Sequence, residues 1–311
     1  MRRQAEEILA QVKTAIVGKE EVLESVLMAM LAGGHVLLND VPGVGKTTLA
    51  VAFSRAMGLG YRRIQFTPDV LPSDIVGFSR YDQTTGGFAY VPGVVNDCNL
   101  LLADEINRTS SKTQSALLEA MEEGRVTVDG TAHSLLRPFC VIATQNEVGT
   151  AGTQPLPQAQ LDRFLVQLTI GYPDLESELD ILRGRQTQDP LDLVRQVSDV
   201  HALLAMQEAA ARVTMTRELM EYLVRLSAAS RDTELLRLGL SPRGTLAVSR
   251  MVRACAWVRG RDYAIPEDVA AVFVPVTAHR VLLSQRARLE QRTTRDVMAE
   301  LRRTVPLPGR G

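Results

Sequence analysis

Short apolar runs alternate with amphipathic stretches between residue 36 and about residue 172. The runs are typical of buried strands, and the amphipathic stretches have the spacing of helices. The expected strands lie at Val36–Leu38, Tyr61–Phe66, Leu100–Ala103, Phe139–Ala143 and Phe164–Ile170. The expected helices between them lie at 46–58, 110–123 and 158–163. This alternation predicts βαβ units, and therefore an α/β fold with a parallel sheet.

Two insertions interrupt the alternation, and helices precede it. Residues 77–95 and 124–137 each hold a glycine-containing turn between short arms, which is typical of hairpins. Residues 4–32 have apolar positions at helical spacing on both sides of a glycine turn, so we expect two helices there.

The pattern changes after residue 172, where we expect no further strand. The expected helices of this second part lie at 174–188, 191–211, 216–230, 242–259, 266–283 and 286–303. We therefore predict two domains, a core over 1–172 and a helical domain over 173–311.

Composition narrows the class of protein without naming a function. The chain has 311 residues, 45% of them hydrophobic, and a net charge of −1, which is ordinary for a globular protein and gives no electrostatic reason to expect nucleic acid or a membrane surface as partner. No apolar stretch approaches the length of a membrane span, and the N-terminus does not resemble a signal peptide. Three isolated cysteines, Cys98, Cys140 and Cys255, suggest buried thiols in a reducing compartment. We expect a cytoplasmic protein.

The stretch from His35 to Thr48 carries the strongest chemical signal. An apolar run is followed by a Pro/Gly loop that ends in Gly45-Lys46-Thr47, and a helical pattern begins at once. This is the strand–loop–helix context of a phosphate-binding P-loop, in which Lys46 would reach the β- and γ-phosphates and the Thr47 hydroxyl would bind Mg²⁺. One position departs from the usual pattern, because Asp40 stands where the first glycine is expected.

A second signal lies at Asp104 and Glu105, which follow the apolar run 100–103. Ligands of open α/β sheets bind at the carboxyl ends of the strands, where this pair is expected. Asp104 would hold Mg²⁺ or its water, and Glu105 would polarise the water that attacks the γ-phosphate. Taken alone, such a pair is more often an ordinary charged loop.

Three further polar residues follow predicted elements. Asn146 ends the strand beginning near residue 139 and would project toward the γ-phosphate, although it is also a common turn residue. Arg163 follows a short helix and would insert into the nucleotide site of a neighbouring subunit; the alternative is an arginine that interacts with its helix dipole. Arg243 begins a helix of the second domain and would reach the phosphates of its own subunit; the alternative is an ordinary exposed arginine.

These motifs, in this order and spacing, resemble the MoxR-type AAA+ ATPases over nearly the full chain. The matching stretches are Ile16–Glu20, Val41–Thr47, Ile64–Asp69, Leu71–Ile75, Leu100–Arg108, Lys112–Met121, Ala143–Asn146, Pro155–Phe164, Ser241–Arg243, Arg261–Tyr263 and Pro266–Val269. The resemblance implies an AAA+ P-loop NTPase core, with a parallel sheet between helices, followed by an all-helical lid domain.

The resemblance also implies a role for each matching residue. Lys46 and Thr47 match the Walker A pair, Asp104 and Glu105 the Walker B pair, Asn146 sensor 1, Arg163 the arginine finger and Arg243 sensor 2. The catalytic set implied is Glu105, Asn146, Arg163 and Arg243. The set implied to hold ATP is Val17, Gly18, Gly43, Val44, Gly45, Lys46, Thr47, Thr48 and Asp104, with Thr47 and Asp104 also holding Mg²⁺. The insertions 77–95 and 124–137 match the helix-2 insert and the pre-sensor-1 hairpin, which face the ring pore or the client in such ATPases.

The chain departs from the family pattern at a few places. Asp40 replaces the first P-loop glycine, Gln158 stands where Glu is common, and Glu147 where Pro is common. Residues 93–98 and Ser110-Ser111 also differ. None of these positions belongs to the catalytic set, although the change at 93–98 bears on client or subunit contacts.

Three functions of different classes fit these motifs. The first is a Mg²⁺-dependent ATPase that forms a homo-oligomeric ring, a hexamer, and remodels or matures a protein client in a chaperone-like way; the resemblance implies a von Willebrand factor A-domain partner. The second is a nucleic-acid motor, against which stand the near-neutral charge and the acidic residues interleaved among the arginines of 286–303. The third is a nucleotide-gated scaffold with negligible turnover, which Glu105 and Arg163 argue against.

Overall fold

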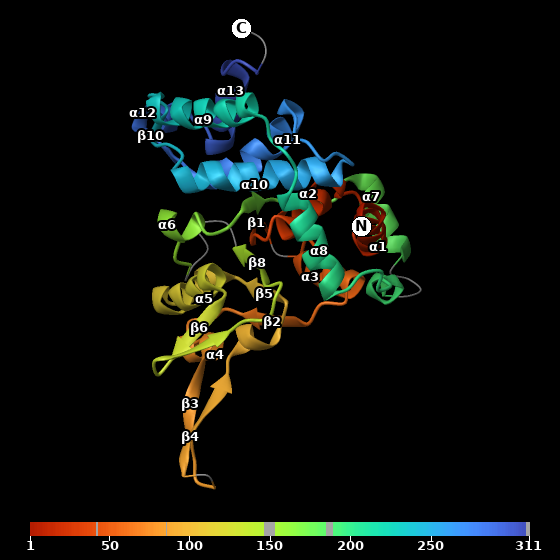
Figure 1. Cartoon of the computed structure of the whole chain (residues 1–311), viewed down its shortest axis with the longest axis vertical. Coiled ribbons are helices and arrows are strands. Elements are labelled where there is room, and N and C mark those ends of the chain that lie inside the picture. The colour runs from red at the N-terminus through yellow and green to blue at the C-terminus, as the bar shows by residue number, and fades with distance from the viewer. Residues whose placement is uncertain (42, 85, 146–152, 185–188, 309–311) are drawn as a thin grey trace.

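A computed structural model describes residues 1–41, 43–84, 86–145, 153–184 and 189–308 of the chain (Figure 1). Its centre is a five-stranded parallel sheet in the order β2-β5-β8-β1-β9. The strands are β1 (Val36–Asn39), β2 (Tyr61–Gln65), β5 (Leu100–Asp104), β8 (Cys140–Gln145) and β9 (Val166–Leu168). All five expected strands and their parallel pairing are therefore confirmed.

Helices cover both faces of this sheet. Alternate residues of a strand point to opposite faces, so Val36 and Leu38 pack with one set of helices and Leu37 with the other. The first set is α1 (Arg2–Ala15), α2 (Glu20–Leu31) and α3 (Lys46–Met57), and the second is α4 (Pro72–Val76) and α5 (Ser111–Glu123). Burial on both faces explains why the strands read as continuous apolar runs.

Short elements connect these layers and support the site. They are η1 (Val94–Asp97), η2 (Ile106–Arg108) and α6 (Gln158–Leu161).

The cysteines Cys98, Cys140 and Cys255 are all buried free thiols, as expected, and burial raises the pKa of each to about 12.

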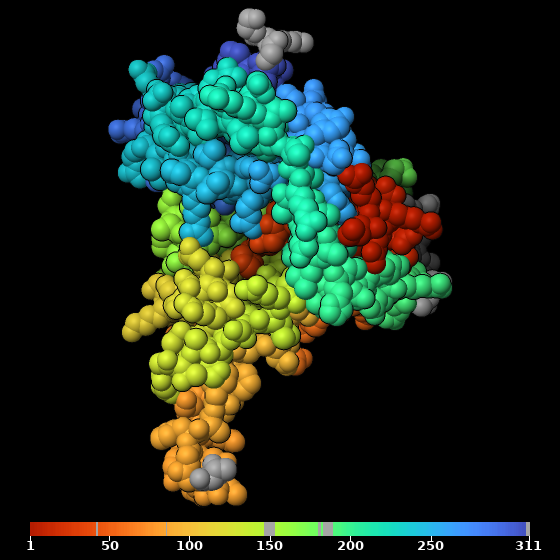
Figure 2. All heavy atoms as spheres, viewed as in Figure 1, coloured from red at the N-terminus to blue at the C-terminus, as the bar shows by residue number. Residues whose placement is uncertain are grey.

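Both expected hairpins are present. The first pairs β3 (Gly77–Asp82) with β4 (Gly87–Pro92), and the second pairs β6 (Arg125–Val128) with β7 (Thr131–Ser134). The β3–β4 hairpin projects from the body as a narrow arm (Figure 2) and carries the exposed aromatic rings of Phe78, Tyr81 and Phe88. Where the hairpins meet, Tyr90 stacks on His133 with ring centroids 3.7 Å apart.

The second part of the chain is mainly helical. Its helices are α7 (Leu175–Gly184), η3 (Pro190–Leu193), α8 (Val200–Ala211), α9 (Arg217–Asp232), α10 (Pro242–Val258), α11 (Pro266–Thr277), η4 (Ala278–Arg280), α12 (Gln285–Leu289) and α13 (Thr294–Thr304). Helix α10 packs on α2, α8, α9 and α11, so this part is seated directly on the core (Figure 1).

Four predictions about this part are wrong in detail. Strands β10 (Leu236–Leu238) and β11 (Leu282–Leu283) form a small antiparallel sheet where only helices were expected. The helix expected at 266–283 ends at Thr277 and is followed by η4 and β11. The helix expected at 191–211 begins at Val200, since Asp199 caps it and the preceding residues lie along Ala56, whose carbonyl accepts the amides of Val197 and Ser198.

The last expected helix, 286–303, is two helices. Gln291 adopts a left-handed φ of 54°, and Thr293 and Asp296 form a capping box that begins α13. Among the described residues, no helix is long and apolar enough to cross a membrane.

Candidate functional site

The loop that follows β1 has the backbone of a phosphate cradle. Gly43 and Gly45 have φ values of 88° and 93°, in the left-handed region that other residues avoid. Helix α3 begins at Lys46, so its first N–H groups point toward the loop. The side chains of Val44, Thr47 and Thr48 are half-buried around this turn. The loop and helix end therefore suit an anion.

Lys46 lies at the centre of the candidate site. Lys46 is 8% exposed, and its Nζ donates to the Asp40 carbonyl oxygen at 2.8 Å. Burial lowers the pKa of the Lys46 ammonium, and the nearby carboxylates of Asp40, Asp104 and Glu105 oppose that shift in part. The structure thus brings Lys46 close to the adjacent residues Asp104 and Glu105, which come much later in the sequence.

The unusual Asp40 has a structural role that glycine could not fill. Its side chain is buried and accepts the backbone amides of Ile170 and Gly171, the latter at 3.1 Å. These amides follow β9, on the far side of β1 from β8. Asp40 therefore ties the start of the loop to the chain leaving the last strand.

Asp104 ends β5 and is held by two neighbours. Thr144 Oγ1 donates to Oδ1 at 2.6 Å, and Arg63 donates to Oδ2 at 2.7 Å. The same Thr144 oxygen accepts the backbone N–H of Glu105 at 2.8 Å, where the chain turns with a left-handed φ of 57°. Thr144 lies on β8 and is fully buried, so one hydroxyl fixes both members of the carboxylate pair.

The side chain of Glu105 is oriented by two donors. Gln65 Nε2 and Arg108 each donate to its Oε2, at 2.9 and 2.8 Å. Sequence reasoning missed Arg63, Gln65 and Thr144. The available signal was their register, because residues 63 and 65 share one face of the edge strand β2 beside β5, and Thr144 stands one position past the Ala103–Ala143 pair.

The turn between α1 and α2 borders the same region. A Cβ on Gly45 would lie 3.7 Å from Ile16, the residue before Val17. A Cβ on Gly18 would lie 2.1 Å from Ser177 Oγ, so this turn packs tightly between the P-loop and α7. The turn that holds Val17 and Gly18 thus begins beside the loop at Ile16, and their contact with adenine stays a prediction. Asn146, predicted as sensor 1, lies outside the described residues.

The two predicted arginines lie together on one carboxylate, that of Glu122. Arg163 Nε is 3.0 Å from one carboxylate oxygen of Glu122, and a terminal nitrogen of Arg243 donates to the other at 2.8 Å. No hydrogen bond or ion pair joins either arginine to the P-loop among the described residues. In the described part of the chain, the ion-pair partners of Arg163 and Arg243 are therefore carboxylates outside the P-loop, Glu122 and Asp162.

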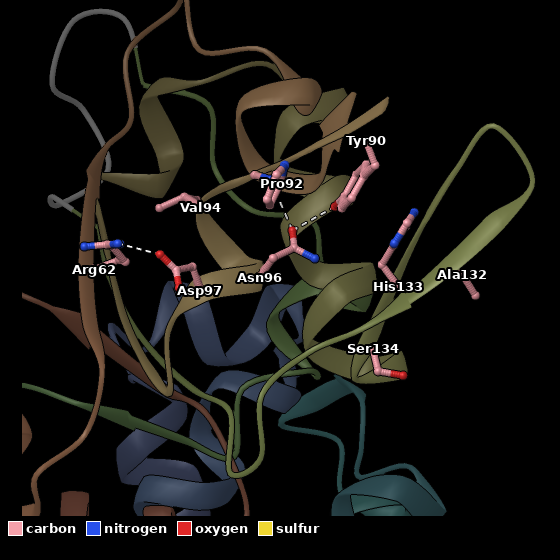
Figure 3. A pocket seen from close by; sticks show the side chains of 10 residues that line it. Arg62, Tyr90, Pro92, Val94, Asn96, Asp97, Ala132, His133 and Ser134 are labelled. Atoms are coloured by element: carbon pink, nitrogen blue, oxygen red, sulfur yellow. Dashed lines mark hydrogen bonds and ion pairs between the residues drawn. The ribbon is translucent and has the colours of Figure 1, made fainter. Parts of the chain in front are cut away.

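A separate pocket lies between the two hairpins and η1 (Figure 3). It measures about 690 Å³ and is lined by Tyr90, His133 and the Arg62–Asp97 ion pair, whose atoms are 2.5 Å apart. No P-loop residue lines it. We therefore assign the chemistry to the carboxyl ends of the strands and not to this pocket.

Comparison with known proteins agrees with this geometry. Residues 35–166 match the ATPase family associated with various cellular activities (AAA), and residues 228–301 match the AAA lid domain. Chaperone MoxR1 of Mycobacterium tuberculosis is 40% identical over 97% of this chain and 82% of its own length. Protein MoxR of Methylorubrum extorquens is 31% identical over 96% of this chain and 93% of its own. The crystal structure of a putative ATPase from Cytophaga hutchinsonii is 35% identical, with a TM-score of 0.90 over 98% of this chain and 95% of its own.

The fold and the site together define a P-loop ATPase with an AAA core and lid. Such an enzyme needs a parallel sheet, a glycine loop after β1 and a carboxylate pair after β5, which is separated from β1 by β8 alone. The chain belongs to the MoxR-type AAA+ ATPases, and ATP hydrolysis is its activity.

Proposed function

We propose that this chain is the subunit of a homo-oligomeric ring, a hexamer, which couples ATP hydrolysis to the remodelling or maturation of a protein client. The observation that carries the proposal is the gathering of Lys46, Asp104 and Glu105 at the carboxyl edge of the sheet, beside the two left-handed glycines of the loop. The relative named Chaperone MoxR1 supports the client part. A cytoplasmic location is part of the same proposal.

The residues at the carboxyl ends of the strands suit ATP together with Mg²⁺. A Cβ at Gly43 would meet no atom of the described residues within 4 Å, so these residues leave room for a phosphate to approach the loop backbone. Thr47 and Asp104 offer hydroxyl and carboxylate oxygens, the ligands that Mg²⁺ prefers, and would hold the ion. Bound there, Mg²⁺ would neutralise charge on the phosphates.

Within its own subunit, each residue has a distinct task. Glu105 polarises the attacking water, and the bonds from Gln65 and Arg108 orient its carboxylate beforehand. Lys46 exchanges the Asp40 carbonyl for the β- and γ-phosphates. Asn146 keeps its proposed contact with the γ-phosphate.

Arg163 is proposed to act on the nucleotide of the neighbouring subunit. Arg243 shares the Glu122 carboxylate with Arg163, which favours action at the same nucleotide over the contact within its own subunit that the sequence suggested. A mixture of Arg163→Ala and Arg243→Ala subunits separates the two cases. If both act at one site, neither variant can supply what the other lacks and turnover stays low; if they act at different sites, mixing restores it.

The exposed arm is the proposed contact with the client, which we take to be a von Willebrand factor A-domain protein. Phe88 is 77% exposed near the tip of the β3–β4 hairpin, where its ring meets the exposed ring of Tyr81 edge-on. The C-terminal helices offer less to nucleic acid, since Arg286 pairs with Glu290 and Glu234, and Arg292 pairs with Glu300.

The experiment is ATP turnover by the full chain, followed by capture of the client. Wild type should hydrolyse ATP in the presence of Mg²⁺, Lys46→Ala should neither bind nor hydrolyse it, and Glu105→Gln should bind without hydrolysis. Immobilised Glu105→Gln with ATP should retain an A-domain protein, and adding Phe88→Ser should release it. If turnover instead requires DNA and weakens steeply as salt is added, the client proposal is wrong and the chain is a nucleic-acid motor.

A further inference from the structure

Glu122 joins an arginine of the core to an arginine of the lid. It is the penultimate residue of α5, and its two carboxylate oxygens are divided between Arg163, which follows α6, and Arg243, in the first turn of α10. The three side chains are partly exposed, at 36% for Glu122, 29% for Arg163 and 47% for Arg243. They are therefore accessible to a molecule that approaches this face.

The position of Glu122 is unfavourable for its own helix. A carboxylate in the last turn faces the negative end of the helix dipole, so the local sequence gives it no reason to be there. Its two cationic partners offset that cost. The backbone beside it is also fixed, because the carbonyl of Met121 accepts a hydrogen bond at 3.1 Å from the buried His35, the residue before β1. The backbone that carries Glu122 is thus held in place by a buried hydrogen bond.

The contacts leave part of each guanidinium group available. Glu122 engages Arg163 at Nε and Arg243 at one terminal nitrogen. Within the described residues, no hydrogen bond is made by the terminal nitrogens of Arg163 or by the second terminal nitrogen of Arg243. These N–H groups are the ones that bind phosphate oxygens in a forked geometry. One carboxylate therefore holds two arginines side by side with donors to spare.

A second carboxylate, that of Asp162, binds arginines at the same contact between core and lid. Asp162 lies 2.8 Å from Nε of the buried Arg280 and 3.8 Å from Nε of Arg243. Arg280 also donates to the carbonyls of Phe164 and Leu165, which locks η4 of the lid onto the chain leading into β9. Three guanidinium groups thus face two carboxylates, and the cluster keeps net positive charge for an anion.

We infer that Glu122 is a positioning residue for catalysis in the adjacent subunit: it orders Arg163 and Arg243 as one pair that receives the phosphates of the neighbour's nucleotide. The inference rests on the proposed function, since it needs Arg163 to act on that nucleotide. Without Glu122 the two long side chains repel each other and lose their common orientation, while the P-loop of the same subunit is untouched.

The test compares Glu122→Gln with Glu123→Gln in the full chain. Glu123 is the next residue, equally acidic, and pairs only with Arg125 among the described residues. Glu122→Gln should lower kcat about tenfold or more, with KM for ATP within about threefold, because an ordered arginine acts mainly in the transition state. Glu123→Gln should stay within about twofold of wild type, and Glu122→Asp should fall between.

Mixing subunits separates positioning from damage to the fold. Glu105→Gln subunits keep Glu122 and both arginines, so mixing them with Glu122→Gln should restore turnover, whereas mixing Arg163→Ala with Glu122→Gln should not. The inference is overturned if Glu122→Gln retains kcat within twofold of wild type, or if Glu105→Gln fails to rescue it while rescuing Arg163→Ala. Absence of turnover in wild type, or full activity of Arg163→Ala, would instead refute the proposed function.

Discussion

At the residue scale, buried polar side chains hold the carboxylate pair in place. Thr144 is the central one, because its hydroxyl donates to Asp104 and accepts from the Glu105 amide. Valine has nearly the same shape but neither hydrogen bond. Thr144→Val should therefore lower kcat about tenfold to a hundredfold and cost about 1–3 kcal/mol of the free energy of unfolding. Steady-state turnover measures kcat, and urea unfolding measures the free energy of unfolding. A kcat equal to that of wild type would show that Thr144 does not position the carboxylate pair.

His35 gives a prediction about pH. Its Nδ1 accepts the Val141 amide at 3.0 Å, so the proton resides on Nε2, which donates to Met121. Burial lowers the pKa of His35 to about 4, from an ordinary value of 6.5, and the pKa of the buried His279 lies well below that value too. Between pH 6.5 and 4 the unfolded chain binds a proton that folded His35 refuses, so stability falls as the pH is lowered.

The expected slope from His35 is about 1.4 kcal/mol per pH unit in that window. Urea unfolding at pH 7 and pH 5 should show the loss in wild type and a smaller loss in His35→Gln, where this imidazole is gone. The remaining slope includes the part of His279. An identical pH dependence in the two proteins would contradict the assignment.

The sequence predicted Lys46, Thr47, Asp104 and Glu105 because each follows a strand with a distinct apolar pattern. It could not predict their supports. Asp40 looked like a defect of the motif, and only the fold shows that its carboxylate binds amides beyond residue 169. Contacts such as these join residues that are far apart in the chain, and no local pattern records them.

At the element scale, the β3–β4 arm depends on its first glycine. Gly77 has a φ of 92°, and a Cβ there would lie 2.4 Å from the carbonyl oxygen of Val91. Gly86 near the tip also has a positive φ, of 68°, but open space around it. Gly77→Ala should cost about 1–3 kcal/mol or more, and Gly86→Ala clearly less, since it adds strain without a clash. Limited proteolysis of the arm and urea unfolding compare them; equal losses would show that the contact is unimportant.

Element ends were harder to predict than elements. All five strands of the central sheet and both hairpins follow from apolar runs and turn residues. The helical spacing of apolar residues in 191–211 continues through residues that come before the helix. Those residues lie along α3 instead, where the Ala56 carbonyl accepts the amides of Val197 and Ser198. The capping box at Thr293 and Asp296 was the available signal for the break before α13.

At the scale of the whole molecule, the proposed site has two halves in one chain. Lys46 and Glu105 form one half, and Arg163 and Arg243 on Glu122 form the other, with no bond between the halves among the described residues. Under the proposed function, Arg163 of a second copy completes the site. Turnover per subunit should therefore rise with protein concentration.

The central claim is tested most directly by mixing two inactive variants. Glu105→Gln subunits keep Arg163 but cannot activate water, and Arg163→Ala subunits keep Glu105 but lack the finger. Equal mixing should restore about a quarter of wild-type turnover, the share of interfaces at which random assembly unites an intact Glu105 with an intact Arg163. Turnover that remains at the level of the separate variants, in mixtures shown to co-assemble, would contradict a site shared between subunits.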